Sequence, residues 1–84
     1  MVGEEVTLRE AETVVQAEGQ RYSVDVRGSP AADGRWIGWV EFKSADGQMR
    51  RTERETTQPN RDALLYWASG LEPIYFEGAF ARSR

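Results

Sequence analysis

The residue types that most often carry enzyme chemistry are scarce in this sequence. It contains no histidine and no cysteine, which excludes the usual zinc sites, cysteine nucleophiles and histidine-based triads. Carboxylate, serine, tyrosine and lysine chemistry remain. Three carboxylates are flanked by apolar residues, where burial would raise a pKa for acid–base catalysis, and they are Glu41, Asp62 and Glu77.

These three carboxylates have no spacing that is diagnostic of a catalytic pair. No glycine-rich phosphate loop and no cluster of metal ligands accompanies them in the sequence. A strand glutamate that faces solvent is the simpler explanation. We therefore expect a protein that is not an enzyme, with no catalytic residue, no cofactor and no metal.

A basic and aromatic surface is the second candidate site. Trp39 and Tyr75 are expected on the sheet face opposite the core, and aromatic rings beside arginines are the stacking platforms of single-strand binders. The acidic neighbours Glu53 and Glu55 interrupt the positive field, so a solvated edge strand is the competing interpretation. Weak single-stranded nucleic-acid binding is thus an alternative function, carried by Trp39, Arg50, Arg51 and Arg54. A wider rim able to grip phosphate or carboxylate would add Lys43 and Arg61.

The third candidate lies on residues 58–71, the one segment with helical spacing of apolar residues. Its apolar stripe needs a sheet to cover it and consists of Ala63, Leu64, Trp67, Ala68 and Leu71. Leu65 and Tyr66 lie off this stripe, so they need deep enclosure or a second partner. The leading prediction is a small protein-interaction module in which Leu65 and Tyr66 contact a protein partner or a second copy in a weak homodimer.

Strands must position that helix. Tyr22, Val24 and Val26 alternate with polar residues, which predicts a half-buried strand. Residues 35–43 predict a central strand in which Gly38 either allows close approach of the helix or marks a bend. Hairpin turns are expected at Glu18-Gly19 and at Asp46-Gly47.

Other boundaries follow from local signals. Residues 1–9 are expected to be frayed, with the first strand starting near Glu10, and residues 28–34 to form a mobile loop. Residues 48–57 are predicted as an exposed edge strand and residues 74–82, with alternating Ile74, Phe76, Gly78 and Phe80, as the last strand. Pro59 suits the first helical position, Gln58 or Asn60 the N-cap, and Gly70 the end of the helix.

The expected fold class is α+β. It consists of a curled antiparallel sheet of four to five strands packed on one helix, in the order strand, strand, strand, strand, helix, strand. The alternative is an SH3-like or partly open small barrel with the helix before its last strand. The expected aromatic core consists of Tyr22, Trp36, Phe42, Trp67, Phe76 and Phe80.

Length and charge complete the description. The 84 residues suit one domain, and a formal net charge of −3 argues against non-specific nucleic-acid binding. The acidic first residues do not resemble a signal peptide and no segment is long and apolar enough for a membrane span, so we expect a cytoplasmic protein.

From residue 36 to residue 82 the chain resembles a family of small bacterial proteins. The resemblance is carried by the stretches WIGWVEF, TERETTQPN and LLYWASGLEPIYFEGAFAR. No established activity accompanies that family, so no functional residue follows from it. The resemblance implies a bacterial, single-domain, cytoplasmic protein.

Overall fold

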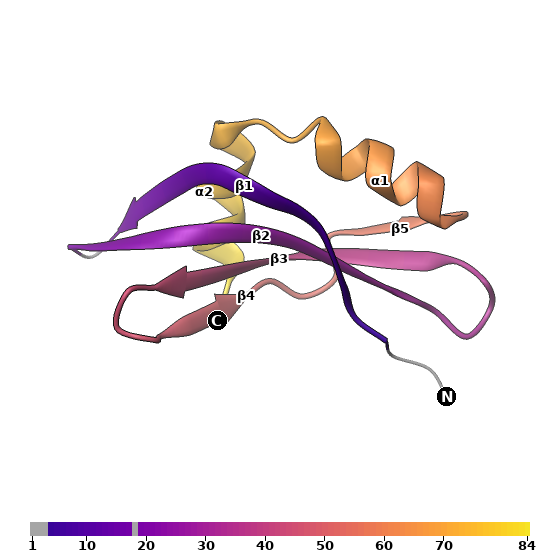
Figure 1. The fold of residues 1–84 in the computed structure, drawn as a ribbon, viewed down its shortest axis with the longest axis horizontal. Coiled ribbons are helices and arrows are strands. Elements are labelled where there is room, and N and C mark those ends of the chain that lie inside the picture. The colour runs from indigo at the N-terminus through magenta and orange to yellow at the C-terminus, as the bar shows by residue number, and fades with distance from the viewer. Residues whose placement is uncertain (1–3, 18) are drawn as a thin grey trace.

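The computed structural model describes residues 4–17 and 19–84, and the side chains of all of these except 11–15 and 17. Five strands precede two helices (Figure 1). In chain order they are β1 (Val6–Ala17), β2 (Gln20–Pro30), β3 (Trp36–Ser44), β4 (Met49–Arg51), β5 (Thr56–Gln58), α1 (Arg61–Ser69) and α2 (Pro73–Arg82).

The strands form one open antiparallel sheet, which confirms the α+β class and excludes a closed barrel. Its order is β1-β2-β3-β4, and β5 pairs with β3 beyond the end of β4. Ala17 pairs with Gln20 at the first expected hairpin, of which Glu18 lies outside the described residues, and Gly19 has a φ of 77°. Gly47, with a φ of 91°, closes the second expected hairpin. Both turns need the positive φ that glycine adopts without strain.

The prediction for residues 74–82 was wrong, because this segment forms the helix α2 and not a strand. Its buried residues Phe76, Ala79 and Phe80 have the i, i+3, i+4 spacing of one helical face. Pro73 occupies the start of α2, where its missing N–H leaves no bond unmade. The four-residue spacing of Phe76 and Phe80 is compatible with both the two-residue period of a strand and the 3.6-residue period of a helix. The helix forms because it packs Phe76, Ala79 and Phe80 together on the sheet.

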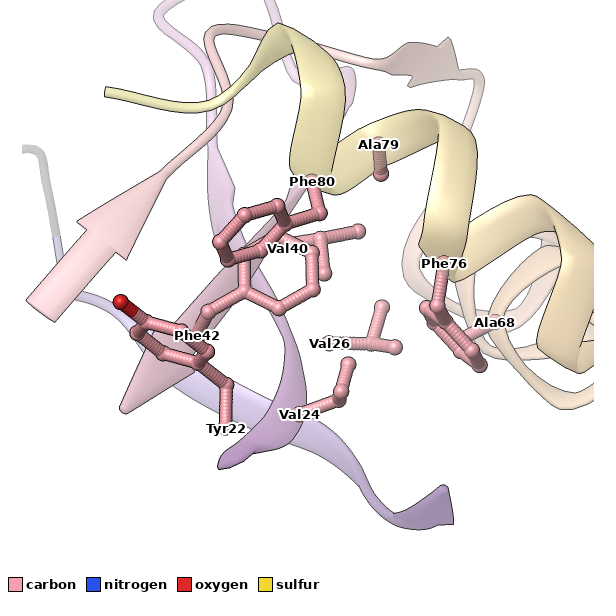
Figure 2. Close-up of a cluster of buried hydrophobic side chains, with 9 residues drawn as sticks. All are labelled: Tyr22, Val24, Val26, Val40, Phe42, Ala68, Phe76, Ala79 and Phe80. Atoms are coloured by element: carbon pink, nitrogen blue, oxygen red, sulfur yellow. The ribbon is translucent and has the colours of Figure 1, made fainter. Parts of the chain in front are cut away.

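One face of the sheet carries the hydrophobic core. Side chains from β2 and β3 converge there with side chains from α1 and α2 (Figure 2). The buried cluster consists of Tyr22, Val24, Val26, Val40, Phe42, Ala68, Phe76, Ala79 and Phe80. Trp67 is half-buried against it, as expected, whereas Trp36 lies outside the cluster. In Figure 1, α2 passes behind β1 and β2, while α1 lies along β5.

Helix α1 begins and ends at the expected caps. The side chain of Asn60 accepts a hydrogen bond from the Ala63 amide at 2.8 Å, and Gly70 is the C-cap. Pro59 therefore precedes the N-cap and does not take the first helical position. The predicted close approach at Gly38 is confirmed, because a Cβ there would lie 2.9 Å from Cδ1 of Leu64. Gly28 pairs with Gly38 and accommodates the same leucine.

Three strand boundaries differ from expectation. β1 starts at Val6 and not near Glu10, because the length of β2 offers partners as far as Gly28. β2 runs to Pro30, so the expected loop is shorter. The fourth strand is split into β4 and β5. Between them Thr52 is buried, and its hydroxyl accepts a hydrogen bond from the Val40 amide at 3.1 Å in place of a regular ladder bond.

Candidate interaction surface

The flank of α1 formed by Leu65 and Tyr66, called here the α1 flank, is open to solvent. Tyr66 is 83% exposed and Leu65 is 36% exposed. Leu64, one residue before this pair, and Ala68, two residues after it, are buried on the sheet. The stripe and the flank are therefore separated as the helical period predicts.

The orientation of α1 depends on a side chain from β1. The Arg9 guanidinium donates from one nitrogen to the carbonyl oxygens of Ala68 and Leu71, both at 2.9 Å. Ala68 lies in the last turn of α1 and Leu71 follows its C-cap, so both carbonyls lie at the helix end that carries partial negative charge. Since the last turn of α1 has no basic residue of its own, Arg9 supplies the compensating charge. The contact fixes the end of α1 nearest Tyr66.

Helix α2 is held by a carboxylate from the β4–β5 connection. Tyr75 donates to Glu55 at 2.5 Å and Arg82 donates to the same oxygen at 2.6 Å. The side chain of Glu55 is only 9% exposed. Burial alone would raise the pKa of Glu55, but hydrogen bonds from Arg82 and Tyr75 outweigh it and leave that pKa lowered. Burial and the bond to Glu55 raise the pKa of Tyr75 to about 12.

Trp39 lies on the outer face of the sheet, which is the face opposite α1 and α2, as predicted. It is nevertheless only 2% exposed. The Arg51 guanidinium lies 4.6 Å from the centre of its ring, and its indole N–H donates to Glu41 at 3.0 Å. Arg51 also lies within 4.0 Å of carboxylate oxygens of Glu5 and Glu41. A nucleic-acid base could reach this ring only after Arg51 had left it.

The arginines predicted to act with Trp39 are not brought together. Arg50 lies on the helix side of the sheet, with its guanidinium 4.2 Å from the centre of the Phe80 ring and donating to the Ser83 carbonyl at 2.9 Å. Arg51 lies on the outer face with Trp39, and Arg54 is exposed in the β4–β5 connection. Tyr75, expected beside Trp39, packs on the core side next to Trp67. The residues predicted to bind single-stranded nucleic acid therefore do not form one continuous surface.

The three carboxylates considered for catalysis occupy different environments. Glu41 is half-buried and accepts the hydrogen bond from the Trp39 indole. Its carboxylate lies 3.8 Å from the Arg27 guanidinium, so it forms a structural ion pair. Asp62 and Glu77 are exposed on α1 and α2. Within the described residues, no three acidic side chains are grouped so that they could hold a metal ion. No helix in that same part of the chain has the length and apolar character to cross a membrane.

Sequence reasoning missed Arg9 and Glu55, the two side chains that position the helices. Each acts on residues far along the chain, and neither belongs to a local motif. A scan against protein-family models found no match, and searches of curated proteins and of solved structures found none either. The resemblance of residues 36–82 to a bacterial family stays a prediction.

Proposed function

We propose that this domain is a non-enzymatic protein-interaction module that uses the α1 flank, and that its simplest partner is a second copy of the chain. The observation that supports this proposal is the 83% exposure of Tyr66 beside Leu65, on a helix that buries Leu64 and Ala68 on its other side. Large apolar side chains that are adjacent and exposed are typical of association surfaces. Tyrosine is especially common there because its ring is apolar and its hydroxyl tolerates water.

A two-fold axis would place the α1 flank against itself, so that each Tyr66 contacts the partner's helix. The polar neighbours Asp62 and Ser69 are exposed on the same helix and would form the rim of such a contact. One face of a nine-residue helix buries far less than the roughly 1,200 Å² of a stable interface. The association should therefore be weak and concentration-dependent.

The proposal includes a bacterial cytoplasmic location. The absence of cysteine from the sequence is compatible with a reducing compartment. The resemblance of residues 36–82 to small bacterial proteins supports the same location.

Sedimentation velocity over a concentration series extending into the millimolar range tests the proposal. The wild type should shift toward a dimer as concentration rises, and Leu65→Glu with Tyr66→Ser should remain monomeric and folded. Met49→Ser is the matched control, because Met49 is 58% exposed on β4 and lies off the α1 flank. A wild type that stays monomeric, or a control that dissociates equally, would contradict the proposal.

A further inference from the structure

A shallow hollow on the outer face lies at the end of the sheet that carries the two hairpin turns, away from the α1 flank. It has a volume of about 360 Å³ and is lined by Arg21, Ser23, Lys43, Ser44 and Ala45. In Figure 1 the β3–β4 turn lies at the same end of the sheet as the start of β2. The hollow thus lies between residues of β2 and β3 that pair directly.

The register of β2 and β3 brings two cationic side chains to this hollow. Ser23 is the direct partner of Lys43, and Arg21 lies two residues before Ser23 on the same face. Arg21 is therefore the diagonal neighbour of Lys43, a separation that long side chains readily span. Both are exposed, and among the described residues neither forms an ion pair. The chain as a whole has a net charge of −3, so this pair of cations gives the hollow a charge opposite to that of the chain.

Among the described residues, two acidic groups lie near the hollow. Asp46 accepts hydrogen bonds from the Ser44 hydroxyl, the Gln48 amide and the Gln20 side chain. Its carboxylate is therefore stabilised within the β3–β4 turn and does not line the hollow. Asp25 is the other diagonal neighbour of Lys43 on β2 and is half-buried. Burial and the charges of Glu10 and Glu41 raise the pKa of its carboxyl, against the opposing effect of Arg27 and Lys43.

We propose that this hollow binds a small molecule that carries a phosphate or pyrophosphate group. Arg21 offers a planar set of N–H donors that matches two phosphate oxygens, and Lys43 adds a second positive charge. The Ser23 hydroxyl donates to the Lys43 carbonyl at 3.2 Å, a long bond, so the hydroxyl can rotate to donate to a ligand oxygen. The open shape of the hollow suits the anionic end of a ligand whose remainder stays in solvent.

Lys43 is the only lysine in the sequence, which allows a direct test. Reductive methylation with ¹³C-formaldehyde labels Lys43 and the terminal amine while keeping both charges. Titration with inorganic pyrophosphate at constant ionic strength should shift the Lys43 methyl signal along a saturating curve. The terminal amine signal should move little and serves as an internal control.

Two exposed arginines provide matched variants. Arg21→Gln should weaken the pyrophosphate affinity about tenfold or more, since it removes a charge-assisted pair of hydrogen bonds. Arg54→Gln removes the same charge elsewhere and should leave the affinity unchanged. Backbone amide spectra of the unmodified protein should show the same saturating shifts at residues 21–23 and 43–45. A linear response equal to that of chloride, equal affinity for succinate, or an unaffected Arg21→Gln variant would overturn the assignment.

Discussion

The two helices pack on the same face of the sheet but are attached to it differently. α2 inserts Phe76, Ala79 and Phe80 into the core, and polar contacts hold it through Glu55 and Arg50. α1 buries only Leu64 and Ala68 fully. Among the described side chains, Arg9 is the one from the sheet that hydrogen-bonds to the C-terminal end of α1. α2 is thus fixed along its length, whereas α1 is fixed by a narrow stripe.

This difference assigns separate roles to the two helices. The wide buried face of α2 contributes Phe76, Ala79 and Phe80 to the buried cluster, whereas α1 contributes Ala68 alone. The narrow stripe of α1 leaves Leu65 and Tyr66 outside the core without loss of packing. We therefore expect substitutions on α2 and beneath α1 to change stability, and substitutions on the α1 flank to change association alone.

The largest effect is expected from Phe76→Ala on α2. Phe76 has no exposed surface, and removing its ring leaves a cavity between β2 and α2. The free energy of unfolding should fall by about 3–5 kcal/mol, enough to unfold much of so small a protein. Urea denaturation measures this loss. Ile74→Ala on the same helix, at a position 76% exposed, should change it by less than about 0.5 kcal/mol. Equal losses from both variants would show that α2 does not pack through this face.

A glycine substitution tests how closely α1 approaches the sheet. In Gly38→Ala the new methyl group would meet Leu64 at 2.9 Å and Trp67 at 3.0 Å, so α1 must move. We expect a loss of about 1–3 kcal/mol from overpacking. Gly78→Ala on α2 is the control, since its new methyl meets only the end of the Arg82 side chain at 3.4 Å. It should gain about 0.5–1 kcal/mol from helix propensity. Melting temperatures that shift in the same direction in both variants would contradict the close approach of α1 to the sheet at Gly38.

The contact of Glu55 with α2 should make stability depend on pH. The pKa of Glu55 is lowered below its ordinary value of 4.5, because the hydrogen bonds from Arg82 and Tyr75 outweigh the effect of burial. Its stabilisation is therefore present above about pH 4.5 and is lost as the pH falls through the folded-state pKa. Glu55→Gln should cost about 1–2 kcal/mol at pH 7 and little in acid.

At alkaline pH the same contact makes stability fall as the pH rises. Burial and the bond to Glu55 raise the pKa of Tyr75 from 10.0 to about 12. The stabilisation it contributes is complete below pH 10 and is lost as the pH rises toward 12. Tyr75→Phe should remove this alkaline loss in denaturation measured across pH. A wild type and variant with parallel pH profiles would show that the contact does not form in solution.

Local patterns predicted the elements whose signals were unambiguous. The alternation in β2, the glycines of both hairpin turns and the Asn60 cap of α1 each follow from one short stretch of chain. Residues 74–82 were misassigned because Phe76 and Phe80 are four apart, a spacing that satisfies both a strand and a helix. Pro73 was interpreted only as a stop after α1, although it also suits the start of a new helix.

For the candidate site, the helical period placed Leu65 and Tyr66 off the buried stripe, and the structure agrees. The burial of Trp39 could not be predicted, because it depends on Arg51 folding back over the ring from a neighbouring strand. The anchoring of α1 by Arg9 and of α2 by Glu55 likewise joins residues far apart in sequence. Such contacts become visible only once the strands and helices are assembled.

The smallest effect on stability is expected from the α1 flank itself. Leu65→Glu with Tyr66→Ser replaces a tyrosine that is 83% exposed and a leucine that is 36% exposed, so the free energy of unfolding of the monomer should fall by about 1 kcal/mol or less. Dilute samples denatured in urea measure this value without a contribution from association. A loss comparable to that of Phe76→Ala would show that the flank belongs to the core.

The central claim is that two copies meet through the α1 flank. Isotope-filtered NOE spectroscopy on a concentrated mixture of labelled and unlabelled protein tests it most directly, because it detects only contacts between molecules. We predict intermolecular NOEs between the Leu65 methyl groups and the Tyr66 ring that fade on dilution and persist in the Met49→Ser control. An absence of intermolecular NOEs at high concentration, or NOEs that arise from Met49 on β4 instead, would contradict the account.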